Sequence, residues 1–239
     1  MMKRVLITGA SSGIGKQLAL DYFAEGWQVI ACGRDEARLV QLSTQCPSIE
    51  IRRFDMTDLA ATREALAQCQ ADLVILCAGT CEYLDNGVVD AERVARVLNT
   101  NLLGPVNCLD AILPQLSSGA HIAMVGSTAS LIPLPRAEAY GASKAALAYF
   151  ARSLAVDLVK RNIHVSLVLP GFVATPLTDR NDFVMPMIIT SQQASRAIRH
   201  GLAKGASEIA FPKLFATLLK LTSMLPQAVQ RALAKRMVR

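Results

Sequence analysis

Short, continuously apolar runs alternate with amphipathic stretches along the whole chain. The apolar runs predict strands at 5–7, 28–32, 49–54, 73–77, 121–125, 164–169 and 208–211, and the amphipathic stretches predict helices at 14–25, 35–45, 58–68, 91–113 and 139–161. Strands that are apolar on both sides are covered on both faces, as parallel strands between two layers of helices are. We therefore predict an α/β fold with a Rossmann-type, doubly wound parallel sheet of about seven strands and helices on both faces.

The domain organisation follows from the same pattern. Neither a repeat nor a low-complexity linker interrupts it, so we expect a single domain over residues 1–239. Periodicity is lost between residues 171 and 195, where prolines and methionines collect. This stretch predicts a substrate lid loop at the carboxyl ends of the strands, where ligands bind in such sheets.

Composition excludes several classes of protein. The chain has 239 residues, of which 52% are hydrophobic and 18% charged, so it is not disordered. Its apolar runs are shorter than the roughly 20 residues of a membrane-spanning helix, and a strand rather than a signal peptide comes first, so we expect a soluble, cytoplasmic protein. The six cysteines include no C-x-x-C pair and are read as reduced thiols, and the three histidines lack metal-ligand spacing, so no metal site is predicted.

Charge is distributed unevenly. The net charge is +6, and residues 211–239 contain six basic and no acidic side chains. The rest of the chain is neutral and lacks basic clusters with stacking aromatics, which argues against nucleic-acid binding. The basic, amphipathic tail at 211–239 is expected to cover the substrate pocket or a subunit interface, and the less favoured alternative is contact with an anionic membrane surface.

A glycine-rich loop separates the first predicted strand from the first predicted helix. The loop consists of Thr8, Gly9, Ala10, Ser11, Ser12, Gly13, Ile14 and Gly15. Its glycines allow the backbone to approach a pyrophosphate, and the helix that follows supplies free N–H groups. The same letters also match the G-x-S-x-G elbow of serine hydrolases, with Ser11 as nucleophile. That alternative is disfavoured because the elbow requires an earlier strand for its oxyanion hole.

Tyr140 and Lys144 lie one turn apart near the start of the helix predicted at 139–161. The spacing places phenol and ammonium on one face of the helix. A free tyrosine has a pKa of about 10, so proton transfer near neutral pH requires a pKa lower by about two to three units. A nearby cation lowers the pKa of a phenol. The pair is therefore a candidate acid/base unit, although such pairs also occur as ordinary helix neighbours.

Further motifs stand in a fixed order around this pair. Ser127 lies thirteen residues before Tyr140, Asn101 lies in Asn-Thr-Asn-Leu-Leu-Gly, and Pro170-Gly171 follows the next strand. Together with the glycine-rich loop, these motifs resemble the classical short-chain dehydrogenase/reductase family over about residues 3–176. The resemblance implies an oxidoreductase that interconverts a carbonyl and an alcohol with a nicotinamide cofactor.

The resemblance also implies a role for each catalytic position. Tyr140 would be the acid/base that protonates the substrate oxygen as hydride reaches the carbonyl carbon. Lys144 would lower the pKa of Tyr140 and hold the nicotinamide ribose. Ser127 would hydrogen-bond the substrate oxygen, where charge develops. Asn101 would anchor a water that links Lys144 to solvent.

Cofactor contacts are implied at further positions. Asp55 resembles the residue that contacts the adenine amino group, and Thr175 the one that binds the carboxamide. The remaining implied contacts are Thr8, Gly9, Ser11, Ser12, Gly13, Ile14, Gly15, Arg34, Ala78, Gly79, Tyr140, Lys144, Pro170, Gly171 and Val173. The chain departs from the family at Leu76-Cys77, where asparagines are usual, which puts in doubt a hydrogen bond that braces the sheet.

The end of the second predicted strand bears on the choice of dinucleotide. An acid at this position binds the ribose 2′-hydroxyl of NAD, whereas an arginine accommodates the 2′-phosphate of NADP. Here the residues are Gly33 and Arg34. We therefore favour NADP(H) over NAD(H), although the second basic position common in such relatives is Ser12.

Two apolar stretches bear on the substrate and on the assembly. Residues 172–190 are rich in apolar side chains, which indicates either an apolar lid over an apolar small-molecule carbonyl or alcohol, or packing against the last strand. The helix over 142–159 is apolar almost all round, which predicts burial on more than one side in a homodimer across this helix, as in relatives of the family; a homotetramer is the alternative. A non-catalytic NADP(H)-sensing module is the alternative function, but it has no need of Ser127, Tyr140 and Lys144 together.

Overall fold

The inner strands of the central sheet bury side chains on both of their faces. The computed structural model describes residues 2–236, and it contains a parallel sheet with the order β3-β2-β1-β4-β5-β6-β9. The strands are β1 (Arg4–Thr8), β2 (Gln28–Gly33), β3 (Glu50–Arg53), β4 (Leu73–Leu76), β5 (His121–Val125), β6 (His164–Pro170) and β9 (Glu208–Phe211). The predicted doubly wound parallel sheet is confirmed.

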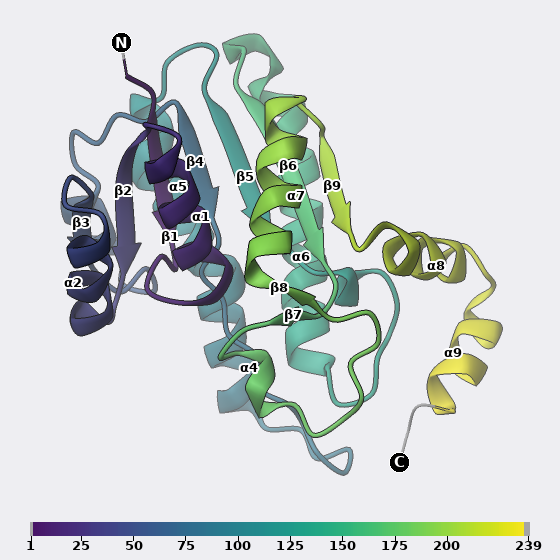
Figure 1. Ribbon diagram of the computed structural model, residues 1–239. Helices are drawn as coiled ribbons and strands as arrows, with labels where there is room; N and C mark the ends of the chain where they lie inside the picture. The colour runs from purple at the N-terminus through teal and green to yellow at the C-terminus, as the bar shows by residue number, and fades with distance from the viewer. Residues whose placement is uncertain (1, 237–239) are drawn as a thin grey trace.

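Two layers of helices cover the sheet (Figure 1). One layer contains α1 (Gly13–Ala24), α2 (Glu36–Gln45) and α7 (Ser191–Ala203), and the other contains α3 (Leu59–Ala65), α5 (Gly104–Ile112) and α6 (Glu138–Asp157), with α4 (Ala91–Leu98) packed on α6. Alternate residues of each strand belong to different layers: Leu6 packs with the second layer, and its neighbours Val5 and Ile7 with the first.

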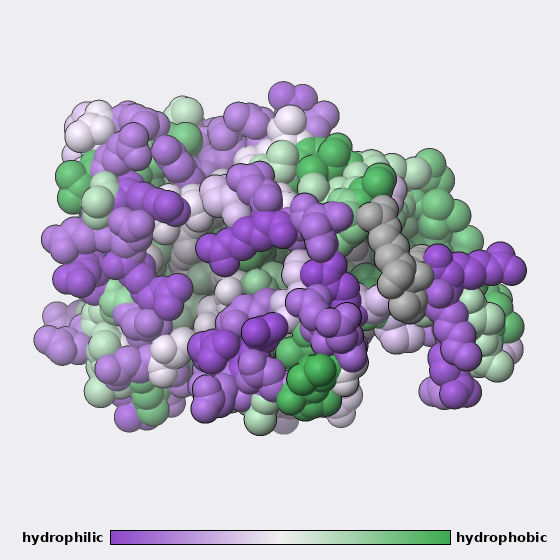
Figure 2. All heavy atoms as spheres, turned by 90° about the horizontal axis from the view of Figure 1, so that it is seen from below, coloured by the Kyte–Doolittle hydropathy of each residue, from purple (hydrophilic) through white to green (hydrophobic). Residues whose placement is uncertain are grey.

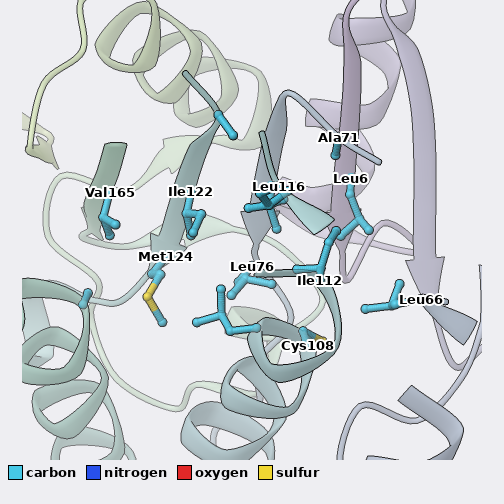
Figure 3. Close-up of a cluster of buried hydrophobic side chains, with 14 of the residues drawn as sticks. Leu6, Leu66, Ala71, Leu76, Cys108, Ile112, Leu116, Ile122, Met124 and Val165 are labelled. Atoms are coloured by element: carbon cyan, nitrogen blue, oxygen red, sulfur yellow. The ribbon is translucent and has the colours of Figure 1, made fainter. Parts of the chain in front are cut away.

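Figure 3 shows part of the second layer. Leu6, Leu76 and Ile122 point from three adjacent strands towards Cys108 and Ile112 of α5, and all five are fully or almost fully buried. These strands carry short aliphatic side chains on both faces, as expected of parallel strands between helices. Their packing holds the carboxyl ends of β1, β4 and β5 rigidly beside one another.

The helix predicted at 91–113 is interrupted by a π-helical segment. α4 passes through Asn99–Leu103, which is π-helical, into α5 and then a 3-10 turn at Leu113–Gln115. The segment places Asn101 in the interior with no exposed surface. An extra residue in one turn does not alter the hydrophobic pattern enough to be read from it, and such turns occur frequently at functional sites.

The segment predicted as a lid loop at 171–195 is more ordered than expected. It contains β7 (Val173–Ala174), which pairs with β8 (Ile189–Thr190), and a 3-10 turn at Thr178–Arg180. α7 begins at Ser191, inside the predicted loop. No helix was predicted between the strands at 164–169 and 208–211. The start of α7 has a local cause, because Thr190 and Gln193 form a capping box at the helix N-terminus.

The predicted basic tail forms two helices beyond the edge strand β9 (Figure 1). They are α8 (Lys213–Ser223) and α9 (Gln227–Lys235). Residue 1 and residues 237–239 of the predicted domain and tail lie outside the described residues. Within residues 2–236, no helix has both the length and the apolarity to cross a membrane.

Candidate active site

A cleft of about 430 Å³ opens at the carboxyl ends of the central strands. Figure 2 views the molecule from this side. The chain order reverses between β1 and β4, and such a switch point leaves a crevice in doubly wound sheets. The cleft is lined by Thr8, Gly9, Ser11, Ser12, Gly13, Ile14, Gly15, Arg34, Asp55, Ala78, Gly79, Ser127, Tyr140, Lys144, Pro170, Gly171, Val173 and Thr175. Of the predicted site residues, Asn101 alone does not line it.

The glycine-rich loop needs its glycines because the backbone is crowded. A Cβ atom added at Gly15 would lie 2.3 Å from the carbonyl oxygen of Gly9, and one added at Gly9 would lie 2.8 Å from Cα of Ala78. Gly9 and Gly13 also have positive φ angles of 70° and 53°. Side chains at these positions would fill or distort the wall of the cleft.

The N-terminus of α1 is open towards the cleft. Ser12 is the N-cap residue, and its side chain makes no capping hydrogen bond. By contrast, Asp35 caps α2 and Asp90 caps α4 through their carboxylates. The first N–H groups of α1 are therefore available to an anion, and the helix dipole adds to the attraction. This end of the cleft fits the pyrophosphate of a dinucleotide.

Thr8 supplies a brace where the family asparagines are missing. Its Oγ1 accepts hydrogen bonds from the backbone N–H groups of Cys77, at 3.0 Å, and Ala78, at 3.2 Å. Leu76 is buried in the core. The connection between β1 and the end of β4 is thus maintained by a hydroxyl and two backbone amides.

Two arginines lie at the adenosine end of the cleft. Nη1 of Arg34 lies 3.3 Å from Oδ2 of Asp55, and Nε of Arg38 lies 3.2 Å from Oδ2 of Asp35. Both arginines line the cleft beside Gly33. Arg38 was not among the predicted residues, although its place in the first turn of α2, shortly after Arg34 in the sequence, is a signal that could have revealed it.

Asp55 also shapes the loop after β3. Its Oδ1 accepts hydrogen bonds from the backbone and the hydroxyl of Thr57 at 2.9 and 2.8 Å. Burial alone would raise the pKa of Asp55, but these hydrogen bonds and the charge of Arg34 together lower it. The carboxylate is therefore ionised at neutral pH and faces the cleft as an acceptor.

Ser127, Tyr140 and Lys144 converge at the other end of the cleft. Ser127 caps the 3-10 turn Thr128–Ser130 and accepts a hydrogen bond from N–H of Ala129 at 3.1 Å. Nζ of Lys144 lies 5.9 Å from the ring centroid of Tyr140 and donates to the carbonyl oxygen of Val125 at 2.9 Å. The predicted phenol, hydroxyl and ammonium therefore share one site.

Burial perturbs both titratable groups of this site. Lys144 is 4% exposed, and its desolvation lowers the pKa of its ammonium to about 8. Burial raises the pKa of Tyr140 to about 12, a hydrogen bond with Ser127 acts in the opposite direction, and Cys81 raises it further. The net direction for Tyr140 is opposite to the one that the resemblance implies for the influence of Lys144.

Asn101 lies behind the cleft and ties three segments together. Its amide nitrogen donates to the carbonyl of Thr80 and to Oγ of Ser143, both at 2.9 Å, and its Oδ1 accepts from N–H of Thr80 at 2.8 Å. Ser143 precedes Lys144 on α6. Asn101 therefore connects the π-helical segment, the loop after β4 and the helix that carries the ammonium.

An aromatic cluster lies between the lid and the loop after β4. The ring of Phe183 lies 5.9 Å from that of Tyr83 and 6.0 Å from that of Phe172. Arg136 stacks over Tyr83 and forms an ion pair with Asp182 at 2.6 Å. The lid thus packs on the loop after β4 through aromatic edges and an arginine. No pattern in the sequence predicted that Tyr83 and Arg136 contact the lid.

Comparison with known proteins identifies the family. A family model described as short chain dehydrogenase matches residues 3–183. The chain belongs to the short-chain dehydrogenase family. It is similar to an uncharacterized oxidoreductase of Myxococcus xanthus, with 33% identity over 98% of this chain and 97% of that one.

Solved structures of other dehydrogenases share the fold. One is a closed form of serine dehydrogenase complexed with NADP⁺, with 25% identity, a TM-score of 0.78, and coverage of 87% of this chain and 94% of that one. Another is a family member from Burkholderia phymatum in complex with NAD, with 20% identity, a TM-score of 0.84, and coverage of 92% of each chain.

These findings establish the reaction class. This short-chain dehydrogenase is an oxidoreductase that acts on a CH–OH or C=O group with a nicotinamide dinucleotide. The similar structures contain NADP⁺ in one case and NAD in the other, so the dinucleotide class is common to both. The predicted family, fold class and enzyme class are confirmed.

Proposed function

We propose that this short-chain dehydrogenase uses NADP(H) to interconvert a carbonyl and an alcohol on an apolar small molecule, with Tyr140 as the acid/base. The observation that carries the proposal is the convergence of Ser127, Tyr140 and Lys144 at one end of a cleft whose other end fits a dinucleotide. The cofactor, when bound, supplies or accepts the hydride. The side chains of the protein hold the substrate oxygen and move its proton.

In the direction of reduction, Tyr140 Oη donates its proton to the substrate oxygen as the carbonyl is reduced. A pKa of about 12 keeps the phenol protonated at neutral pH, which is the form that reduction requires. Ser127 Oγ donates a hydrogen bond to the same oxygen, where negative charge develops. The phenolate left behind lies beside the ammonium of Lys144, which stabilises it.

Asn101 acts as a positioning residue in this scheme. Both protons of its amide are engaged by Thr80 and Ser143, so the side chain fixes the start of α6 relative to the loop after β4. The resemblance assigns to Asn101 a water that links Lys144 to solvent, and this role stays a prediction. In either role Asn101 holds Lys144 in place.

The preference for NADP(H) rests on Arg34 and Arg38. Each pairs with a carboxylate at the surface, and such exposed pairs are weak enough to be exchanged for a phosphate dianion. Replacing both arginines with glutamine should lower the ratio of kcat/KM for NADPH over NADH about tenfold. Arg53, which is equally exposed and lies outside the cleft, provides the matched control.

The apolar character of the substrate is supported by the rings beside the site. Phe172 and Phe183 of the lid pack with Tyr83, which is close enough to Tyr140 to interact with it electrostatically. The contact between Phe172 and Phe215 of α8 extends this surface towards the tail. A lid of this composition accepts an apolar group beside the reacting carbon.

The same geometry argues against the two alternative functions, a serine hydrolase and an NADP(H)-sensing module. A serine hydrolase would need a base beside Ser11, but no histidine lines the cleft within the described residues. An NADP(H)-sensing module would keep the glycine-rich loop and the arginines, yet it would have no use for a buried lysine with a lowered pKa beside a tyrosine.

We also propose that two copies pair across α6. Three large apolar side chains of this helix and its 3-10 extension, Tyr149, Val156 and Val159, are more than 70% exposed in the single chain. Their burial in a dimer would account for the apolar character of the helix. Val156→Asp should convert the dimer to a monomer in sedimentation equilibrium, and an unchanged mass would contradict this interface.

The proposed function is tested with a panel of carbonyls and alcohols monitored by NADPH absorbance, with NADH in parallel. The expected result is reduction of apolar carbonyls with NADPH, loss of turnover in Tyr140→Phe with retained dinucleotide binding, and turnover that persists in Ser11→Ala at saturating dinucleotide. Dinucleotide binding without turnover on any member of the panel would favour the sensing module. Ester cleavage that is lost in Ser11→Ala would favour the hydrolase.

A further inference from the structure

α8 and α9 form a C-terminal arm, defined as residues 213–236, that presents an apolar face to solvent. Leu214, Leu218 and Leu221 recur every three or four residues and lie on one side of α8, and Leu225, just past the end of the helix, is also exposed. Leu214 is 62% exposed and Leu221 58%. Moving such side chains out of water is favourable in free energy. An exposed stripe of this kind therefore indicates a contact surface.

The other side of α8 is already occupied by the body of the protein. Ala216 is buried, and the ring of Phe215 lies 5.8 Å from that of Phe172 in the lid. Lys220 forms an ion pair with Glu208 of β9. These contacts place the opposite side of α8 against the body, so the leucine stripe faces solvent.

α9 extends the same surface. Nε2 of Gln230 donates to the carbonyl oxygens of Ser223 and Leu225 at 3.0 and 2.8 Å, which holds α9 against the end of α8. Met224 and Val229 near this junction are exposed. In Figure 2, hydrophobic side chains gather at the right of the molecule, where Figure 1 places the two helices, beside hydrophilic ones.

Cations border this apolar surface. Lys213, Arg231, Lys235 and Arg236 are exposed, and none of them forms an ion pair within the described residues. Residues 211–239 contain no acidic side chain. An apolar stripe bordered by unpaired cations is complementary to a surface with an apolar interior and negatively charged headgroups.

We infer that the C-terminal arm docks on the surface of an anionic lipid bilayer. The leucine stripe enters the boundary between headgroups and acyl chains, and the four cations contact the lipid phosphates. A second copy of the arm is a poorer occupant, because a two-fold contact would bring the same cations together with no acid to neutralise them. The inference concerns binding alone and is independent of the proposed function.

The test is co-sedimentation of the full-length protein with vesicles. One set contains phosphatidylcholine with 30% phosphatidylglycerol, and the other contains phosphatidylcholine only. The wild-type protein is expected to bind the anionic vesicles, and the binding should weaken as salt is added. Leu218→Ser with Leu221→Ser should lower binding about tenfold, and Arg231→Gln with Lys235→Gln about 25-fold, at roughly fivefold per cation.

Matched controls separate the arm from general stickiness or charge. Val88→Ser with Val89→Ser removes two exposed apolar side chains elsewhere, and Lys160→Gln with Lys204→Gln removes two exposed cations elsewhere. Both control pairs should bind like the wild type. Circular dichroism checks that every variant is folded, and turnover of a water-soluble carbonyl should be the same in all of them.

Three outcomes would overturn the inference. One is failure of the wild-type protein to bind anionic vesicles. Another is equal binding by the arm variants and the wild type, which would place the lipid contact elsewhere. The last is a self-association in sedimentation equilibrium that disappears in Leu218→Ser with Leu221→Ser while vesicle binding is absent, which would make a second copy the occupant.

Discussion

Lys144 is predicted to weaken the folded state at neutral pH, so removing its charge should stabilise the protein while abolishing turnover. The ammonium is 4% exposed, and its one hydrogen bond to protein is to the carbonyl of Val125 among the described residues. Its burial lowers the pKa from 10.5 to about 8. At about 1.36 kcal/mol per pKa unit, this change corresponds to about 3 kcal/mol of unfavourable free energy.

The sign and the pH window follow from the two pKa values. Below pH 8 the lysine is charged in both the folded and the unfolded state, so the folded state bears the whole cost of desolvation. Between pH 8 and 10.5 the unfolded state binds more protons than the folded state, so stability increases with pH. Above pH 10.5 the group is neutral in both states and the cost is gone.

The assay is urea unfolding of the wild type and Lys144→Met at pH 7 and pH 10.5. The stability of the variant relative to the wild type should fall by about 3 kcal/mol between these pH values, whatever the loss of the bond to Val125 contributes. Lys160→Met is the matched control, because it removes an exposed ammonium, and its difference from the wild type should stay constant. A constant difference for Lys144→Met as well would refute the reasoning.

Three further predictions concern the loop, the brace and the lid. Thr8→Val leaves the N–H groups of Cys77 and Ala78 without their acceptor and should lower the free energy of unfolding by about 1–3 kcal/mol in urea titrations, whereas Thr8→Ser should cost far less. Gly15→Ala forces a Cβ atom to within 2.3 Å of a carbonyl oxygen and should weaken dinucleotide binding at least about tenfold in calorimetry. In Gly141→Ala the added Cβ atom would lie 3.5 Å from the carbonyl oxygen of Ala129, so this control should bind the dinucleotide like the wild type. Arg136→Met removes ion pairs at the lid and should raise KM for the carbonyl severalfold with little change in kcat or in Tm; an unchanged KM would exclude a role for Arg136 in lid closure.

The fold was predictable because its main signals are periodic. Apolar runs such as 73–77 are read directly as buried parallel strands, and their order along the chain implies the doubly wound sheet. The π-helical segment around Asn101 was not predictable, because one extra residue in a turn leaves the hydrophobic pattern almost unchanged. α7 as a whole was not predicted, and its start could not be read from periodicity because the capping box at Thr190 acts locally.

The site was predictable to the extent that its residues belong to motifs. The glycine-rich loop, Ser127, Tyr140 and Lys144 line one cleft as expected. The direction of the Tyr140 pKa was not predictable, because it depends on how much of the ring the surrounding chain buries. Long-range partners such as Arg136 and Asp182 come together only in the folded chain, so no local sequence pattern predicts their contact.

The central claim is that Tyr140 transfers a proton to a carbonyl oxygen while hydride reaches the carbonyl carbon. It is tested most directly with NADPH that carries deuterium at the reactive carbon of the nicotinamide, using an apolar ketone from the panel. The account predicts that the wild-type enzyme places deuterium on the carbinol carbon of the product, and that Tyr140→Phe binds the dinucleotide but forms no labelled alcohol. Labelled alcohol formed by Tyr140→Phe at the wild-type rate would contradict it.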